Sequence, residues 1–108
     1  MLLNEYQDAA TQTAVYPDAY GLFYTALGAA EEAGEICGQM KRVIRDDECV
    51  IKDDRRDKLR MECGDLLWYV SQIARHLGCT LEDVAKSNLR KLQERQSRDA
   101  LKGKGDTR

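Results

Sequence analysis

The sequence predicts an all-α protein, and three observations support this class. Apolar residues recur three or four positions apart through most of the 108 residues, as they do along one face of an α-helix. Alternating runs of β-branched residues are scarce, and there is one proline. The length suits a single domain. We expect a compact bundle of four helices. Its helices are apolar on more than one stripe, so we expect oligomerisation to complete it.

The first helix is predicted for residues 2–15, in which Leu3, Tyr6 and two alanines recur at helical spacing. Pro17 ends this helix because its ring fixes the backbone angle φ. Asp18 follows, and its carboxylate is suited to capping the next helix.

The second helix is predicted for residues 19–44, and it contains Gly28, Gly34 and Gly38. A glycine inside a helix costs about 0.5–1 kcal/mol relative to alanine. Three of them in one helix indicate a close approach of another helix or room for a ligand.

Residues 45–54 are polar and aperiodic, which predicts a loop. A third helix is expected over residues 55–78, where Gly78 serves as the residue just past its end. Thr80, with an acid three positions later, is suited to starting a fourth helix over residues 81–99.

The chain shows no sign of export. Residues 1–15 lack the pattern of a signal peptide, and no window approaches the length of a membrane span. The four cysteines lie 12 to 16 positions apart and form no CxxC motif, so a zinc site has little support. We expect reduced thiols and a cytosolic protein, in a bacterium or a phage-infected host.

The charge is unevenly distributed. The formal net charge is −2, yet residues 86–108 carry eight Lys or Arg residues and three acids. An acidic body with a basic end suits either nucleic acid or a polyphosphate bound with the help of a cation. Charge alone does not separate these two.

Two pairs of carboxylates lie inside otherwise apolar runs. Glu32 and Glu35 form one pair in the second helix, and Glu62 and Asp65 form the other in the third. Residues three apart share a helix face, so each pair points in one direction. Neighbouring antiparallel helices can bring the pairs face to face, in what looks like an interior. The alternative is that these acids are solvated and pair with nearby Lys and Arg side chains.

Converging carboxylates repel one another unless a cation joins them. Oxygen ligands alone suit Mg²⁺ or Mn²⁺ rather than zinc. A di-iron bundle would need histidine three residues after an acid. The single histidine, His76, is eleven residues past Asp65, and we expect it to be an exposed residue near a helix end.

Together the acids read EEAGE at 31–35 and ECGD at 62–65. This EExxE and ExxD pattern resembles the MazG-type all-α nucleoside triphosphate pyrophosphohydrolases, relatives of the dimeric dUTPases and dCTPases. The similarity extends through ECGDLLWYVSQIARHLG and LEDVAKSNLRKLQERQSR. The two ends of the chain resemble small stand-alone members from bacteria and phages. The resemblance implies a domain over residues 1–100, followed by a basic tail at 101–108.

The resemblance also implies roles for individual residues. The implied metal ligands are Glu32, Glu35, Glu62 and Asp65. The implied catalytic residues, which orient or deprotonate water, are Glu31 and Glu35. The candidates for substrate binding are Asn88, Lys91, Lys41, Trp68, Tyr69, Lys104 and Arg108. At their helical spacing, the two aromatic residues could instead belong to the core.

The expected function is hydrolysis of a (deoxy)nucleoside triphosphate to the monophosphate and pyrophosphate, with Mg²⁺ as the cofactor and Mn²⁺ as a substitute. One alternative is a base-specific dUTPase, dCTPase or dGTPase of the same fold. Another is a non-catalytic helical interaction module. We expect a homodimer or homotetramer, no membrane partner, and no stable nucleic-acid partner, because no recognition motif is present.

Overall fold

The computed structural model describes residues 1–98, and within them it contains α-helices, one short 3₁₀ helix and no strand. The elements are α1 (Leu3–Thr11), the 3₁₀ helix η1 (Asp18–Tyr20), α2 (Gly21–Asp46), α3 (Asp53–His76) and α4 (Leu81–Ser97). The prediction of an all-α fold with four main helices is confirmed. None of the described helices is long and apolar enough to cross a bilayer.

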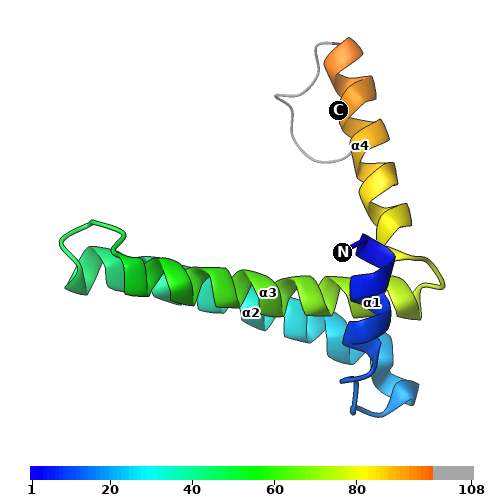
Figure 1. The fold of residues 1–108 in the computed structure, drawn as a ribbon, viewed down its shortest axis with the longest axis horizontal. Helices are drawn as coiled ribbons and strands as arrows, with labels where there is room; N and C mark the ends of the chain where they lie inside the picture. The colour runs from blue at the N-terminus through cyan, green and yellow to red at the C-terminus, as the bar shows by residue number, and fades with distance from the viewer. Residues whose placement is uncertain (99–108) are drawn as a thin grey trace.

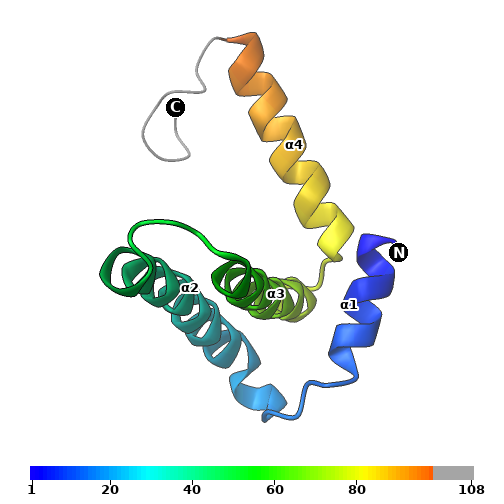
Figure 2. The same cartoon turned by 60° about the vertical axis from the view of Figure 1, so that its left-hand side comes forward.

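The two long helices, α2 and α3, lie side by side and antiparallel as a helical hairpin (Figures 1 and 2). Helix α1 packs across the end of α3, and α4 starts at the same junction. From there α4 points away from the hairpin (Figure 2). Among the described residues, no Cα atom of α4 comes within 8 Å of α2.

Several helix boundaries differ from the prediction. Helix α1 ends at Thr11, and Asp18 begins the 3₁₀ helix η1 instead of capping α2, whose N-terminus has no side-chain cap. Helix α3 begins at Asp53, earlier than predicted. The reason is favourable electrostatics, since two acids in the first turn of a helix interact well with its dipole. The loop is therefore shorter than expected.

The signals between α3 and α4 are confirmed. Gly78 has a φ of 75°, a left-handed value that glycine adopts without strain, and it lies just past the end of α3. At the start of α4, the Thr80 hydroxyl accepts a hydrogen bond from the Asp83 N–H, and the Asp83 carboxylate accepts one from the Thr80 N–H. This reciprocal pair is a capping box.

Glycine permits close approach of α2 and α3 at two points. A Cβ atom on Gly28 would lie 2.1 Å from the ring of Tyr69, and one on Gly21 would lie 2.1 Å from the ring of His76. Gly34, by contrast, faces open space. The expectation that His76 is exposed was wrong. It is half-buried because its ring fills the space above Gly21, and its Nε2 lies 2.6 Å from the Tyr16 hydroxyl.

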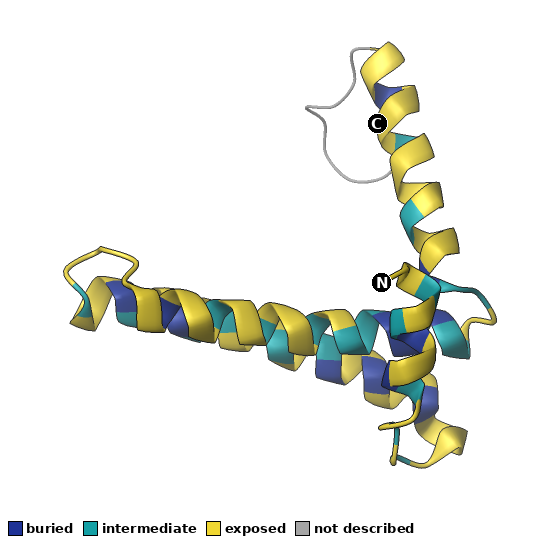
Figure 3. Ribbon diagram, in the orientation of Figure 1, coloured by how far each residue is buried: buried dark blue, intermediate teal, exposed yellow. Residues whose placement is uncertain are grey.

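Few residues are buried (Figure 3), and several of the buried ones are polar. The buried hydrophobic residues are Ala10, Val43, Ala74 and Leu81. Gln7 joins three elements, because its amide donates to the Ser71 carbonyl oxygen at 3.0 Å and accepts from the Leu81 N–H at 3.0 Å. All four cysteines are free.

Candidate metal centre

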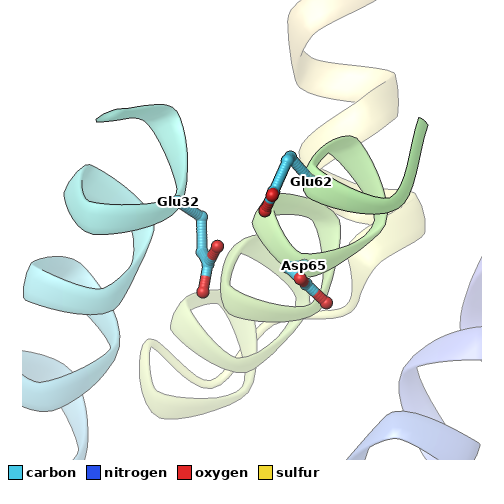
Figure 4. Close-up of side chains that lie close together, drawn as sticks. All are labelled: Glu32, Glu62 and Asp65. Atoms are coloured by element: carbon cyan, nitrogen blue, oxygen red, sulfur yellow. The ribbon is translucent and has the colours of Figure 1, made fainter. Parts of the chain in front are cut away.

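Three carboxylates from the two long helices converge. Glu32 on α2 meets Glu62 and Asp65 on α3, and one oxygen atom of each lies within 4.8 Å of the others (Figure 4). The convergence follows from the sequence, because Glu62 and Asp65 share a face of α3 and the antiparallel hairpin sets that face against α2. Glu32 also lies one turn after Gly28, which has no side chain and so leaves room for the ring of Tyr69 on α3.

The cluster lies at the edge of the hairpin, not in an interior. Glu32 and Glu62 are half-buried, while Asp65 is exposed. The expectation of an interior failed because small residues such as Ala33, Gly34 and Gly64 flank the acids but are themselves exposed. Water can therefore reach the carboxylates.

The electrostatics of the cluster favour a positive ion. Burial raises the pKa of the Glu32 carboxyl above its usual range, and the negative charges of Asp65 and Glu62 raise it further. Glu31 and Glu35 add smaller effects of the same sign, so both lie near Glu32. A cation bound among these acids would relieve the repulsion.

Aromatic side chains and the end of α1 border the acids. Glu32 and Asp65 line a cavity of about 370 Å³ together with Thr13, Trp68 and Tyr69. The indole N–H of Trp68 donates to the Thr13 hydroxyl at 2.8 Å. This hydrogen bond holds the segment that follows α1 next to the acids. The aromatic side chains offer a surface for a flat ring. The carboxylates beside them offer oxygen ligands for a cation that is bound to phosphate.

A second cavity adjoins the first. It has a volume of about 340 Å³ and is lined by Tyr24, Leu27, Gly28, Glu31 and Tyr69. Tyr69 lines both cavities. Burial raises the pKa of the Tyr69 hydroxyl, and the nearby Tyr24 adds to the effect.

The structure brings together part of the predicted site. Three of the four predicted metal ligands converge, and Trp68 and Tyr69 lie beside them. Glu35 is exposed on α2 and lies outside the group of three. Glu31 lines the second cavity. The roles predicted for these residues stay predictions.

Lys41, Asn88 and Lys91, which were predicted to bind phosphate, are not among the residues that line the cavity of the acids. Lys41 is exposed on α2. Asn88 and Lys91 line a cavity of about 450 Å³ along α4, which shares no lining residue with the cavity of the acids. Lys104 and Arg108 lie outside the described residues.

Sequence reasoning missed Thr13, Tyr24 and Tyr6. Tyr24 could have been found, because it precedes Glu32 by eight residues and so shares its helix face. The pKa of the Tyr6 hydroxyl is raised by burial and by the charge of Asp65, which places α1 near the acids. Thr13 falls within the first predicted helix, but it lies beyond the end of α1, so helical spacing does not place it beside the acids.

The chain is similar to known proteins over most of its length. The MazG nucleotide pyrophosphohydrolase domain matches residues 24–98, which include α2, α3 and the acidic cluster. The gene 37 protein of Mycobacterium phage L5 is 43% identical over 114 residues, an alignment that spans the whole of both chains. No solved structure matches the chain. The chain belongs to the family of MazG nucleotide pyrophosphohydrolase domains.

Proposed function

We propose that the protein hydrolyses a (deoxy)nucleoside triphosphate to the monophosphate and pyrophosphate, using Mg²⁺ bound at the acidic cluster. The observation that carries this proposal is the convergence of Glu32, Glu62 and Asp65 beside an aromatic-lined cavity. Family membership supports the reaction class.

The donor set fits a magnesium ion. All three converging groups are carboxylates, and hard oxygen ligands are those that Mg²⁺ and Mn²⁺ prefer. The exposure of Asp65 leaves room for the waters that Mg²⁺ usually keeps. When bound, the ion neutralises phosphate oxygens and lowers the pKa of a coordinated water.

The other residues contribute positioning and proton transfer. Glu31 and Glu35 lie close enough to Glu32 to raise its pKa, and either carboxylate is suited to orienting or deprotonating the attacking water. The rings of Trp68 and Tyr69 offer stacking surfaces for the base. The basic residues that follow residue 85 supply positive charge for the departing pyrophosphate.

In a cell, this reaction would remove a surplus or non-standard nucleotide from the cytosolic pool. The protein would work as a homodimer or homotetramer, since so few of its hydrophobic residues are buried in one chain.

The test is pyrophosphate release from a panel of the common NTPs and dNTPs plus dUTP, with and without Mg²⁺. We expect release from at least one of them, dependent on the ion, and loss of release in Asp65→Asn. The panel also separates a broad enzyme from a base-specific one. Absence of release from every nucleotide would leave a non-catalytic module as the better account.

A further inference from the structure

The connecting segment, residues 12–17, joins α1 to η1 (Figure 2). Within residues 1–98, the N–H groups of Val15 and Tyr16 make no hydrogen bond to another backbone group. Side chains of α3 hold this part of the chain instead. They follow one another at the spacing i, i+4, i+7 and i+8, which places them on one face of the helix. These side chains are Trp68, Gln72, Arg75 and His76.

Hydrogen bonds join this face of α3 to the connecting segment in two places. The Trp68 indole N–H donates to the Thr13 hydroxyl at 2.8 Å. Further along, Arg75 Nη2 donates to the Tyr16 hydroxyl at 3.0 Å, and the same hydroxyl lies 2.6 Å from His76 Nε2. Thr13 lines the cavity of the acids, so the position of the connecting segment shapes that cavity.

The hydrogen bonds around Tyr16 determine where the proton of His76 lies. A guanidinium group can only donate, so the Tyr16 oxygen accepts from Arg75 and its single proton is left for His76 Nε2. Arg75 Nη2 also lies 3.4 Å from Nε2, so a second donor faces the same ring nitrogen. Nε2 is therefore an acceptor, and the neutral ring carries its proton on Nδ1.

A proton that His76 takes up from water would end this arrangement. Nε2 would then carry an N–H and could no longer accept from Tyr16. Within residues 1–98 no acid pairs with His76, and on α2 its ring meets Gly21, which has no side chain. The last turn of α3 attracts positive charge, but the Arg75 guanidinium, 3.4 Å from Nε2, repels it.

The ring of Tyr16 also packs against the aromatic side chains near the acids. It stacks on Tyr24 with ring centroids 4.6 Å apart, and it meets Trp68 edge to face with centroids 6.2 Å apart. The Trp68 centroid is in turn 5.0 Å from that of Tyr69, and both rings line the cavity of the acids. A movement of Tyr16 would therefore reach Thr13 and both of these rings.

We propose that His76 is a positioning residue, whose neutral ring holds the connecting segment beside the acids through Tyr16 and whose protonation releases the segment. This inference rests on the proposed function, because the cavity that the segment shapes is the one proposed to take the nucleotide. Tyr16 and His76 are not among the described residues that line this cavity. Protonation of His76 therefore weakens the binding of nucleotide more than it slows the chemical step.

The first test uses the fact that the chain has one histidine and one tryptophan, so each gives an unambiguous signal. Long-range ¹H–¹⁵N NMR of the imidazole at about pH 8 should show the proton on Nδ1. Between about pH 8 and about pH 5, where histidine side chains usually change charge, the fluorescence of Trp68 should change with the same midpoint as the His76 signals. A proton on Nε2 of the neutral ring, or Trp68 fluorescence that ignores the protonation of His76, would overturn the proposal.

Three variants separate His76 from the acids, which titrate near Trp68 as well. His76→Gln keeps an acceptor oxygen that does not titrate. Tyr16→Phe keeps the ring and removes the hydroxyl, and Tyr20→Phe makes the same change at an exposed tyrosine. The fluorescence change with the midpoint of His76 should be absent from the first two variants and present in Tyr20→Phe. Its persistence in Tyr16→Phe would contradict the proposal.

The kinetic test compares the KM for nucleotide with that of His76→Gln at the same pH, which cancels the effects of pH on the acids and on the metal. Near neutral pH, Tyr16→Phe should raise KM about 3-fold or more, as expected for the loss of one hydrogen bond, with a smaller change in kcat. As pH falls, the KM of the unmodified protein should rise toward that of Tyr16→Phe, relative to His76→Gln. Far-ultraviolet circular dichroism checks that each variant keeps its helices.

These measurements separate this proposal from the proposed function. If no nucleotide is hydrolysed, but Trp68 follows the protonation of His76 in the unmodified protein and not in Tyr16→Phe, the reaction is wrong and the hold of His76 on the segment stands. If hydrolysis occurs and the KM ratio to His76→Gln is the same at every pH, the positioning role is overturned while the reaction stands.

Discussion

The ring of Tyr69 lies directly against Gly28, so that a Cβ atom on Gly28 would fall 2.1 Å from Tyr69 Cε1. This contact sets the spacing of α2 and α3 one turn before Glu32. It also fixes the position of the Tyr69 ring, which lines the cavity of the acids and the second cavity. A single missing side chain thus links helix packing to the geometry of the candidate site.

Gly28→Ala is therefore expected to lower both activity and stability. The added methyl group must displace the Tyr69 ring, and overpacking of this kind costs about 1–3 kcal/mol. Thermal unfolding and pyrophosphate release measure the two effects. Gly34→Ala is the matched control, because it adds the same methyl group to the same helix where nothing lies within 4 Å.

For the control we expect the melting temperature to hold or rise, since alanine is favoured over glycine inside a helix by about 1 kcal/mol. Equal losses in the two variants would show that the contact between Gly28 and Tyr69 has no special role.

The acidic cluster is tested by removing single charges. Glu62→Gln and Asp65→Asn keep the size of each side chain and are expected to lower turnover by more than about 100-fold, because even the outer partners of metal ligands contribute 10–100-fold. Stability without metal should hold or rise, since repulsion is relieved. Asp57→Asn, at an exposed acid of the same helix paired with Arg60, should keep full turnover. Variants of the cluster that are as active as Asp57→Asn would remove it from the site.

The pH dependence follows from the raised pKa of Glu32. The carboxyl holds its proton more tightly in the folded protein than at its ordinary pKa of 4.5. Without metal, the contribution of the Glu32 carboxyl to the free energy of unfolding therefore falls as pH rises from 4.5 to the raised pKa. Above the raised pKa this contribution is constant. Mg²⁺ offsets this loss at neutral pH. At a concentration about 100 times its Kd, the ion would add about 2.7 kcal/mol to the free energy of unfolding.

Calorimetric unfolding across this pH range, with and without Mg²⁺, measures both effects. We expect the gain from Mg²⁺ to shrink in acid, because the ion must displace a proton. Glu32→Gln should remove the pH dependence that belongs to this group. A melting temperature that Mg²⁺ leaves unchanged at neutral pH would speak against a metal site here.

Much of this arrangement could be predicted from the sequence. Helical periodicity located the four helices, and the spacing of Glu62 and Asp65 placed both acids on one face. Gly78 and Thr80 marked the turn before α4 because each has a local physical reason to be there. These features depend only on neighbours in the chain.

What the sequence did not predict depends on contacts between distant residues. Gln72 and Ser71 are buried against α1, where the Gln72 amide donates to the Thr11 hydroxyl and the Ser71 carbonyl oxygen accepts from Gln7. A polar residue gives no sign of such a partner in its own segment. His76 is half-buried for a similar reason, since it packs on Gly21. The direction of α4 is likewise a property of the junction, which helical periodicity does not encode.

The final prediction concerns the far end of the hairpin, where Arg55 stabilises the loop between α2 and α3 through hydrogen bonds. Arg55 is 8% exposed, its Nε donates to Asp47 at 2.8 Å, and its Nη1 donates to the Gln39 side chain at 2.6 Å. Arg55→Ala leaves both acceptors without this donor and should lower the melting temperature by several degrees. Arg56→Ala, at an exposed ion pair with Asp53, should change it little.

The interaction of Arg55 with Asp47 predicts that the stability of the protein depends on pH. The hydrogen bond from Arg55 lowers the pKa of Asp47 below its ordinary value of 3.8. The stabilisation is therefore complete above that value and is lost as pH falls through the lowered pKa. The difference in melting temperature between the unmodified protein and Arg55→Ala should then be largest near neutral pH and shrink in acid. A difference that is constant from neutral pH down through this range would mean that Arg55 stabilises the loop by packing alone.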